Sequence, residues 1–138
     1  MFTKRQLVRF QHCDPAGMVF YPRYLDMAHA TVEDWFSDKI GMSFADIHGD
    51  RRSSVPVVSL SMTFHAPSRL GDVLELRLSV EKIGETSLQI VIAAFCREEA
   101  RFTAPMTLVQ ISMEDYRPRP WDEAIRQRFL RDDAGGRS

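Results

Sequence analysis

The chain lacks several features that mark easily recognised classes of protein. Only two of its 138 residues are cysteine, Cys13 and Cys96, which excludes a disulfide framework, and neither belongs to a CxxC pair of the metal-binding type. No apolar run approaches the roughly 18 residues needed to cross a bilayer. The first ten residues also lack the apolar core of a signal peptide. We therefore expect a reduced, cytoplasmic protein with no membrane partner.

An excess of charge of one sign is missing as well. The 18 basic and 19 acidic residues give a net charge of −1, so no overall positive field would attract nucleic acid. The four histidines are scattered without the i, i+4 spacing of a zinc site, and we expect no metal. Neither a GxSxG segment nor a glycine-rich phosphate loop is present. Serine-esterase chemistry and nucleotide hydrolysis are therefore unsupported.

One segment has the apolar spacing of an amphipathic helix. A proline at 22 suits the first helical position, where a missing N–H costs nothing, and a glycine at 41 suits the end. We predict a helix over about 22–39, and one more helical turn within 43–52. The apolar residues of the helix over 22–39 recur at helical intervals, namely Leu25, Ala28, Val32, Trp35 and Phe36.

On either side of this helix, apolar and polar residues alternate as in half-exposed strands. Pro105 cannot donate to a ladder and the alternation slips near Leu108, which predicts a bulge or an edge at that point. In the fourth strand both faces are apolar, so we expect both to be covered, for instance by another subunit. The five predicted strands span about 2–10, 55–66, 74–80, 88–96 and 102–113.

These elements predict a single α+β domain over 1–138. Short turns favour antiparallel pairing, and five strands can curl around one apolar helix. A short C-terminal helix is expected from Trp121 to Phe129, with a flexible tail over about 132–138. Because one helix covers only one face of such a sheet, the other face and the edges favour a second copy of the chain.

The loop before the helix holds the most promising reactive group, the carboxylate of Asp14. An isolated Asp-Pro pair favours a turn or capping role. The helix start at Pro22, however, places free backbone N–H groups just beyond the acid. Pro22 has no N–H, which makes Tyr21 the expected donor. Such groups, with the positive end of the helix dipole, can hold a developing oxyanion and so assist hydrolysis of an activated acyl group.

Other candidate groups have less support. Cys13 adjoins Asp14, but no paired motif accompanies it and a small buried residue is the simpler interpretation. His12 and His65 are more often hydrogen-bonded structural histidines than catalysts. Arg117 and Arg119, at the end of the last strand, are either solvated or a clamp for the phosphates of a carrier such as coenzyme A.

The segment Asp-Pro-Ala-Gly-Met-Val-Phe-Tyr-Pro-Arg-Tyr-Leu at 14–25 resembles the signature of the hot-dog-fold acyl-CoA thioesterases. The resemblance is greatest to the 4-hydroxybenzoyl-CoA thioesterase branch and its YbgC-like relatives. Phe-His-Ala-Pro-Ser-Arg-Leu-Gly-Asp-Val-Leu at 64–74 and Gly-Glu-Thr-Ser-Leu at 84–88 are similar to later parts of the same family. The resemblance implies a five-stranded antiparallel sheet around one long helix, and hydrolysis of an acyl-CoA thioester. Coenzyme A would be part of the substrate, and no separate cofactor is implied.

The resemblance also implies roles for individual residues. Asp14 would be the nucleophile or the general base. The backbone N–H of Tyr21 would polarise the thioester carbonyl, and Gly17 would let the loop approach the substrate. The wall of the acyl pocket, over Val55 to Ser59, would come from the facing subunit of a homodimer, and dimers often pair into homotetramers in this family. Arg117 and Arg119 would lie near the CoA phosphates.

Two departures weaken transfer of the aromatic substrate. The 4-hydroxybenzoyl enzyme has consecutive arginines where this chain has Gly84 and Glu85, and a threonine where it has Val55. Two other functions stay open. A hot-dog hydratase or dehydratase would act on the same carrier, although its usual histidine and acid are not found here. A non-catalytic module would bind acyl-CoA without releasing thiol.

Overall fold

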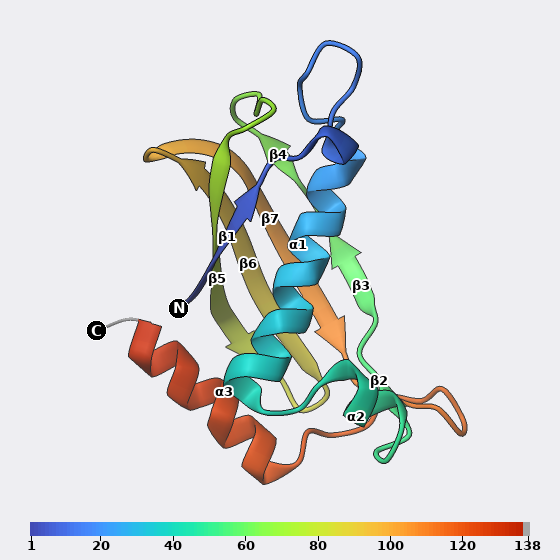
Figure 1. The fold of residues 1–138 in the computed structure, drawn as a ribbon. Helices are drawn as coiled ribbons and strands as arrows, with labels where there is room; N and C mark the ends of the chain where they lie inside the picture. Colours follow the sequence, from blue (N-terminus) through green and yellow to red (C-terminus); the bar gives the residue numbers. More distant parts are fainter. Residues whose placement is uncertain (137–138) are drawn as a thin grey trace.

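One long helix lies against an antiparallel sheet in the computed structural model, which describes residues 1–136 (Figure 1). Helix α1 spans Pro22–Trp35, and the π-helical turn η2, Phe36–Ile40, continues it. Pro22 is its first residue, and Gly41 ends the helical stretch with a φ of +74° that favours glycine. The predicted helix is therefore confirmed at both ends.

The main sheet has the strand order β1-β5-β6-β7-β3, and β4 pairs with β7 on the same side as β3. All of these pairings are antiparallel, as the short connections predict. A separate two-stranded ribbon joins β2 to β8. The strands span Phe2–Leu7 (β1), Ser53–Ser54 (β2), Val57–Leu60 (β3), Thr63–Phe64 (β4), Val73–Ile83 (β5), Ser87–Cys96 (β6), Glu99–Val109 (β7) and Ile111–Ser112 (β8).

The predicted strands over 55–66 and 102–113 are each divided in the structure. Pro105 pairs in register with Val91 on β6, whereas β3 has a register shift between Val57 and Ser59, opposite Leu108 and Thr107. The predicted irregularity therefore lies in the β3–β7 ladder beside Leu108 and not at Pro105 in the β6–β7 ladder. The N–H of Ser61 donates to the carbonyl of Pro105 at 3.2 Å, which shows that the backbone polar side of Pro105 faces the gap between β3 and β4. The proline thus occupies a place where the neighbouring edge strand is interrupted and no donor is needed.

The core lies between α1 and the sheet. Alternate side chains of β5, β6 and β7 are buried, and burial of each large one stabilises the fold by about 1.5–3 kcal/mol. On α1 the predicted apolar face is buried, except that Leu25 is half-buried and Tyr24 and Met27 take its place. The fully buried strand residues include Leu74, Leu76, Leu78, Leu88, Ile92, Phe102 and Ala104.

Two further helices close the end of the core away from the loop that precedes α1 (Figure 1). Helix α2, Phe44–His48, is capped at its N-terminus by Ser43, whose Oγ accepts the N–H of Asp46 at 3.1 Å. Helix α3 spans Glu123–Gly136 and buries Phe129, which confirms the predicted C-terminal helix. It continues into the segment predicted to be a flexible tail, of which residues 137–138 lie outside the described part.

None of the helices in residues 1–136 covers the second face of the sheet (Figure 1). Val91, Ala93 and Phe95 of β6 are half-buried there, whereas the alternate residues of the same strand are buried. The expectation that a second copy covers this face therefore stays a prediction. Within the described range, no helix combines the length and the apolar character required to cross a membrane.

Candidate active site

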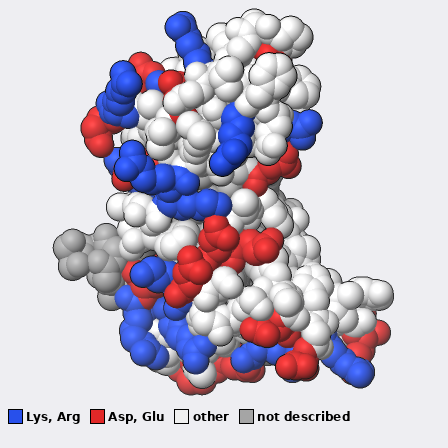
Figure 2. Space-filling view, viewed as in Figure 1, with Lys and Arg blue, Asp and Glu red and all other residues white. Residues whose placement is uncertain are grey.

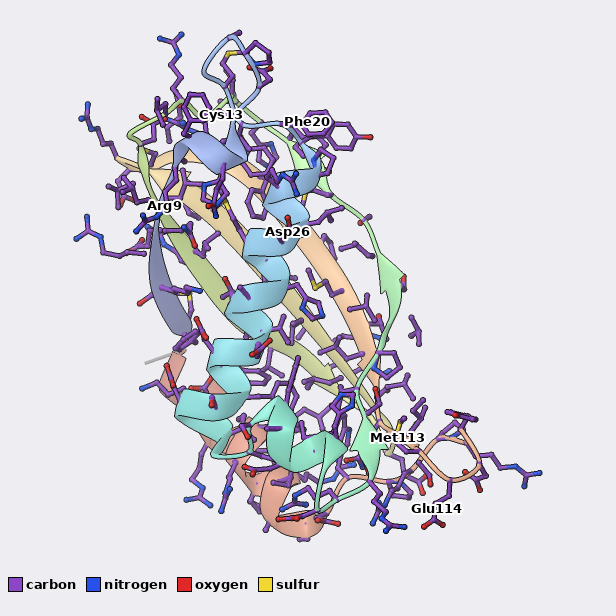
Figure 3. All side chains as sticks on the ribbon, turned by 45° about the vertical axis from the view of Figure 1, so that its right-hand side comes forward. Arg9, Cys13, Phe20, Asp26, Met113 and Glu114 are labelled. Atoms are coloured by element: carbon purple, nitrogen blue, oxygen red, sulfur yellow. The ribbon has the colours of Figure 1, made fainter. Side chains whose placement is uncertain are left out.

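The loop between the 3₁₀ turn η1, Phe10–His12, and α1 folds back on itself as a short hairpin. Cys13 bridges to Val19, and the N–H of Phe20 donates to the carbonyl of His12 at 2.9 Å. Gly17 lies in the turn with a φ of +79°, a conformation that other residues adopt only with strain. Figure 3 shows Cys13 and Phe20, one on each arm of the hairpin, at this end of the molecule.

The carboxylate of Asp14 holds this hairpin in shape. Its Oδ1 accepts the N–H of Ala16 at 2.9 Å and the N–H of Met18 at 3.2 Å. The turn role that an Asp-Pro pair favours is therefore real. It occupies only one of the two oxygens, because no hydrogen bond from residues 1–136 reaches Oδ2. The half-buried Asp14 thus keeps an oxygen that can face a ligand.

At the start of α1 one backbone donor lacks a partner. Phe20 donates to His12, Pro22 has no N–H, and Arg23 donates to the carbonyl of Phe20 at 2.8 Å. The N–H of Tyr21 has no acceptor within residues 1–136. The first turn of a helix leaves such donors free, and together with the helix dipole they attract negative charge.

Aromatic side chains surround this helix start. Phe20, Tyr21 and Phe64 are 50%, 61% and 49% exposed, which is unusual for rings of this size. The ring centroids of Phe20 and Tyr21 are 5.6 Å apart, and those of Tyr21 and Phe64 are 6.1 Å apart. This cluster could not be predicted from the sequence, because Phe64 joins it only through the placement of β4 beside α1.

Val55 and Ser59 do not reach the Asp14 loop within one chain. Val55 is 8% exposed and belongs to the chain's own core. Ser59 is exposed on β3, at the edge of the sheet.

Arg117 and Arg119 line a cavity of about 520 Å³ beside the β2–β8 ribbon. Glu114 lines the same cavity, and Figure 3 places it at the far end of α1 from Cys13 and Phe20. The 14 residues of α1 alone separate the two ends by roughly 21 Å, at a rise of 1.5 Å per residue.

The cavity is also lined by Arg51 and Arg52, two basic residues that were not predicted to belong to a site. Their only signal was an Arg-Arg pair in a polar loop. The Nη1 of Arg119 donates to the carbonyl of Arg51 at 2.8 Å and to Oγ of Ser53 at 2.9 Å, so Arg119 is fixed by its own chain. Carboxylates lie nearby, as Arg51 pairs with Asp122 at 2.7 Å. Figure 2 likewise shows acidic and basic side chains interspersed on the face that carries α1.

Comparison with known proteins decides the family. Residues 8–129 match the family model of the Thioesterase-like superfamily. The chain belongs to this superfamily. It is 29% identical over 90 residues to a 1,4-dihydroxy-2-naphthoyl-CoA hydrolase of Acaryochloris marina, a match that covers 65% of this chain and 64% of the relative. For the hydrolase of the same name from Nostoc punctiforme the identity is 30% over 89 residues, covering 64% and 60%. The chain thus spans slightly less than two thirds of these relatives.

Solved structures confirm the hot-dog fold of this superfamily member. A 1,4-dihydroxy-2-naphthoyl-CoA thioesterase from Synechocystis superposes with a TM-score of 0.86 at 23% identity, covering 94% of this chain and 95% of that one. The narrower assignment to the 4-hydroxybenzoyl-CoA or YbgC-like branch stays a prediction. Among residues 1–136 no group of three or more His, Cys, Asp or Glu side chains is placed to hold a metal ion.

His12 has a structural role in this thioesterase-like chain, as expected. Its side chain is 8% exposed, and its Nδ1 accepts the N–H of Arg9 at 2.8 Å. Burial lowers the pKa of His12 below the ordinary 6.5; the positive charges of Arg9 and Arg23 lower it further, and Asp26 opposes them. Protonation at Nδ1 would also replace the acceptor by a second donor facing the N–H of Arg9.

The lowered pKa of His12 predicts that stability falls in mild acid. Between the folded pKa and 6.5 the unfolded chain binds the proton first, so the stabilisation is present above 6.5 and is lost as the pH falls. His12→Asn keeps an acceptor for Arg9 but cannot titrate. Urea unfolding between about pH 7.5 and pH 5.5 should therefore give a flatter free energy of unfolding in His12→Asn than in the wild type. Equal slopes in His12→Asn and the wild type would contradict the prediction.

Proposed function

We propose that this thioesterase-like protein hydrolyses an acyl-CoA thioester to the free acid and coenzyme A. One observation carries the proposal: the loop–helix junction offers a carboxylate oxygen, Oδ2 of Asp14, and a backbone donor, the N–H of Tyr21, that have no partner within residues 1–136. These are the two groups that acyl transfer from a thioester needs. The names of the curated relatives and the family match support the same reaction class.

Two routes are compatible with this pair of groups. In the first, Oδ2 of Asp14 attacks the thioester carbon and the N–H of Tyr21 holds the oxyanion. The C–S bond then breaks, CoA leaves as the thiolate and takes up a proton, and water hydrolyses the mixed anhydride. In the second route Asp14 removes a proton from a water molecule, which attacks the same carbon. Both routes consume one water and yield the acid and the CoA thiol.

We further propose an aromatic acyl group. The exposed rings of Phe20, Tyr21 and Phe64 form an apolar surface at the helix start, and a planar aromatic acyl group can stack on such rings. The relatives from Acaryochloris marina and Nostoc punctiforme are named for 1,4-dihydroxy-2-naphthoyl-CoA, which makes that thioester the first to test.

Binding of the CoA phosphates by Arg117 and Arg119 requires a homodimer in this proposal, because they lie at the opposite end of α1 from Asp14. Strand β3 is an edge strand with Val58 and Leu60 exposed. Two copies paired antiparallel through β3 would bring the loop of one beside the arginine cavity of the other. Dimers could pair further through the uncovered sheet face, giving a homotetramer. The free cysteines fit a reduced, cytoplasmic setting.

Thiol release tests the proposed reaction directly. The purified protein is assayed with aromatic, short-chain and long-chain acyl-CoAs, and free CoA thiol is measured, with Asp14→Asn as the control. We expect release that is fastest with the aromatic thioester and that depends on Asp14. Binding of CoA esters without thiol release would indicate a non-catalytic module. Addition of water to an enoyl-CoA would indicate a hydratase.

A further inference from the structure

The Asp14 hairpin does not stand alone, because it is paired by its backbone to the segment 67–72. The N–H of Val19 donates to the carbonyl of Ser68 at 2.9 Å, and the N–H of Leu70 donates to the carbonyl of Gly17 at 2.9 Å. Met18 and Arg69 form an isolated antiparallel bridge between these contacts. The N–H of Met18 also donates to Asp14, so the hairpin links this segment to the carboxylate.

The segment 67–72 is in turn anchored by one side chain from the sheet, Arg101 of β7. Its Nη1 donates to the carbonyl of Pro67 at 2.9 Å, to Oγ of Ser68 at 3.2 Å and to Oδ2 of Asp72 at 2.8 Å. The side chain of Arg101 is only 11% exposed. The same Oδ2 of Asp72 accepts the N–H of Arg69 at 3.0 Å. One guanidinium therefore joins both ends of the segment to the sheet.

Such an ion pair fixes the relative positions of its partners more than it stabilises the fold. Burial by itself raises the pKa of Asp72, but the N–H of Arg69 and the guanidinium of Arg101 together hold it below its ordinary value, so Asp72 is charged. A partly buried ion pair loses much of its Coulomb energy to desolvation, while its charge-assisted hydrogen bonds fix direction and distance. The Nε of Arg101 lies 2.9 Å from Oε1 of Glu99, but the two atoms do not have the geometry of a hydrogen bond.

We infer that the Arg101–Asp72 pair is a positioning device for the reactive carboxylate, acting through the segment 67–72 and the hairpin. The inference rests on the function proposed for Asp14. Helix α1 is held by its own core contacts, so the N–H of Tyr21 does not depend on this pair. Loss of the pair therefore moves Asp14 relative to Tyr21, and misplacement of about 1 Å can lower a rate by about 100-fold.

Kinetics of Arg101→Lys separate this role from a general loss of stability. The ammonium keeps the charge, but the shorter lysine side chain does not carry its nitrogen as far as Nη1 of Arg101, so part of the three-way contact is expected to be lost. We expect kcat to fall at least about 10-fold, with KM changed by less than about threefold, because the arginines proposed to bind the CoA phosphates belong to the other copy of the proposed homodimer and make no hydrogen bond to Arg101 or Asp72 within residues 1–136. Asp72→Asn should show the same split between kcat and KM, and it serves in place of Arg101→Lys if that variant fails to fold.

Arg77→Lys is the matched control. Arg77 also lies on the sheet and pairs with two carboxylates, Glu75 at 2.6 Å and Glu98 at 3.2 Å, but it makes no hydrogen bond to the segment 67–72. It should keep both kcat and KM within about twofold of the wild type. An equal fall of kcat in Arg77→Lys and Arg101→Lys would overturn the inference, since it would show a general effect of the sheet arginines.

Amide hydrogen exchange gives a readout that does not depend on catalysis. In Arg101→Lys the amides of Met18, Val19 and Leu70 should exchange at least about 10-fold faster, while those in the middle of β6 keep their wild-type rates. Unchanged exchange in the hairpin, or an equal rise in β6, would overturn the inference. Absence of thioester hydrolysis in the wild type would refute the proposed function instead, and local loosening of the hairpin would still show that Arg101 sets the loop.

Discussion

Asp14→Asn should keep the fold and lower thioester hydrolysis by at least roughly 100-fold, the lower end of what a general acid or base contributes. The amide still offers one oxygen, which can accept the N–H groups of Ala16 and Met18 as Oδ1 does now. The turn is therefore expected to persist. The other oxygen becomes an NH₂ group, which can neither attack a carbonyl nor take up a proton.

The measurement is kcat for thiol release, taken together with the midpoint of thermal unfolding. Asp26→Asn is the matched control, because Asp26 is an exposed carboxylate early in α1 that pairs only with Arg23, at 3.2 Å, within residues 1–136. It should retain hydrolysis within about twofold. Near wild-type turnover in Asp14→Asn would contradict the role of Asp14 as nucleophile or general base, whatever the effect of the substitution on stability.

A single turnover in heavy-oxygen water distinguishes the two routes available to Asp14. Label recovered on the carboxylate of Asp14 would favour the mixed anhydride, because water that attacks the carboxyl carbon of Asp14 in that anhydride leaves its oxygen on the side chain. Absence of label on Asp14 would argue against attack of water at the carboxyl carbon of Asp14, and it is the result expected when Asp14 activates water. The hydrogen bonds to Oδ1 suit either route, since they orient the carboxylate without occupying Oδ2.

Local features of the site could be predicted because they depend on neighbours in the sequence. Pro22 starts α1 and Gly41 ends its helical extension, and each acts through its own backbone conformation. The turn at Asp14 and Gly17 is local in the same sense. The unpartnered N–H of Tyr21 follows from the position of Pro22 alone.

Features that depend on the meeting of distant segments could not be predicted. The contact of Arg101 with Asp72 joins residues 29 positions apart, and no motif around Arg101 predicts it. The interruption between β3 and β4 shows the same limit, because Pro105 acts on a neighbouring strand and not on its own. The separation of Asp14 from Arg117 along α1 is also a property of the fold, because the order of motifs in the sequence does not say how far apart they lie in space.

Phe129→Ala should be the most destabilising of the substitutions considered, with a loss of about 3–5 kcal/mol in the free energy of unfolding. Phe129 is 0% exposed. Its ring stacks on Trp35 with centroids 5.6 Å apart and meets Phe36 and Trp121 edge-on at 5.9 Å and 5.0 Å. Removing it would leave a cavity among three aromatic rings at the junction of α1, η2 and α3. Since small domains have only about 5–15 kcal/mol in total, this loss is a large fraction.

Urea unfolding followed by tryptophan fluorescence measures the effect directly, because both tryptophans of the chain, Trp35 and Trp121, contact Phe129. Protein concentration must be equal for all variants, since association would shift the apparent stability. Phe10→Ala is the matched control: Phe10 is 82% exposed, and its removal should change the free energy by less than about 0.5 kcal/mol. If Phe129→Ala had as small an effect as Phe10→Ala, α3 would be an appendage to the hot-dog domain. A loss of several kcal/mol in the free energy of unfolding would instead show that α3 belongs to the core that packs against the C-terminal end of α1.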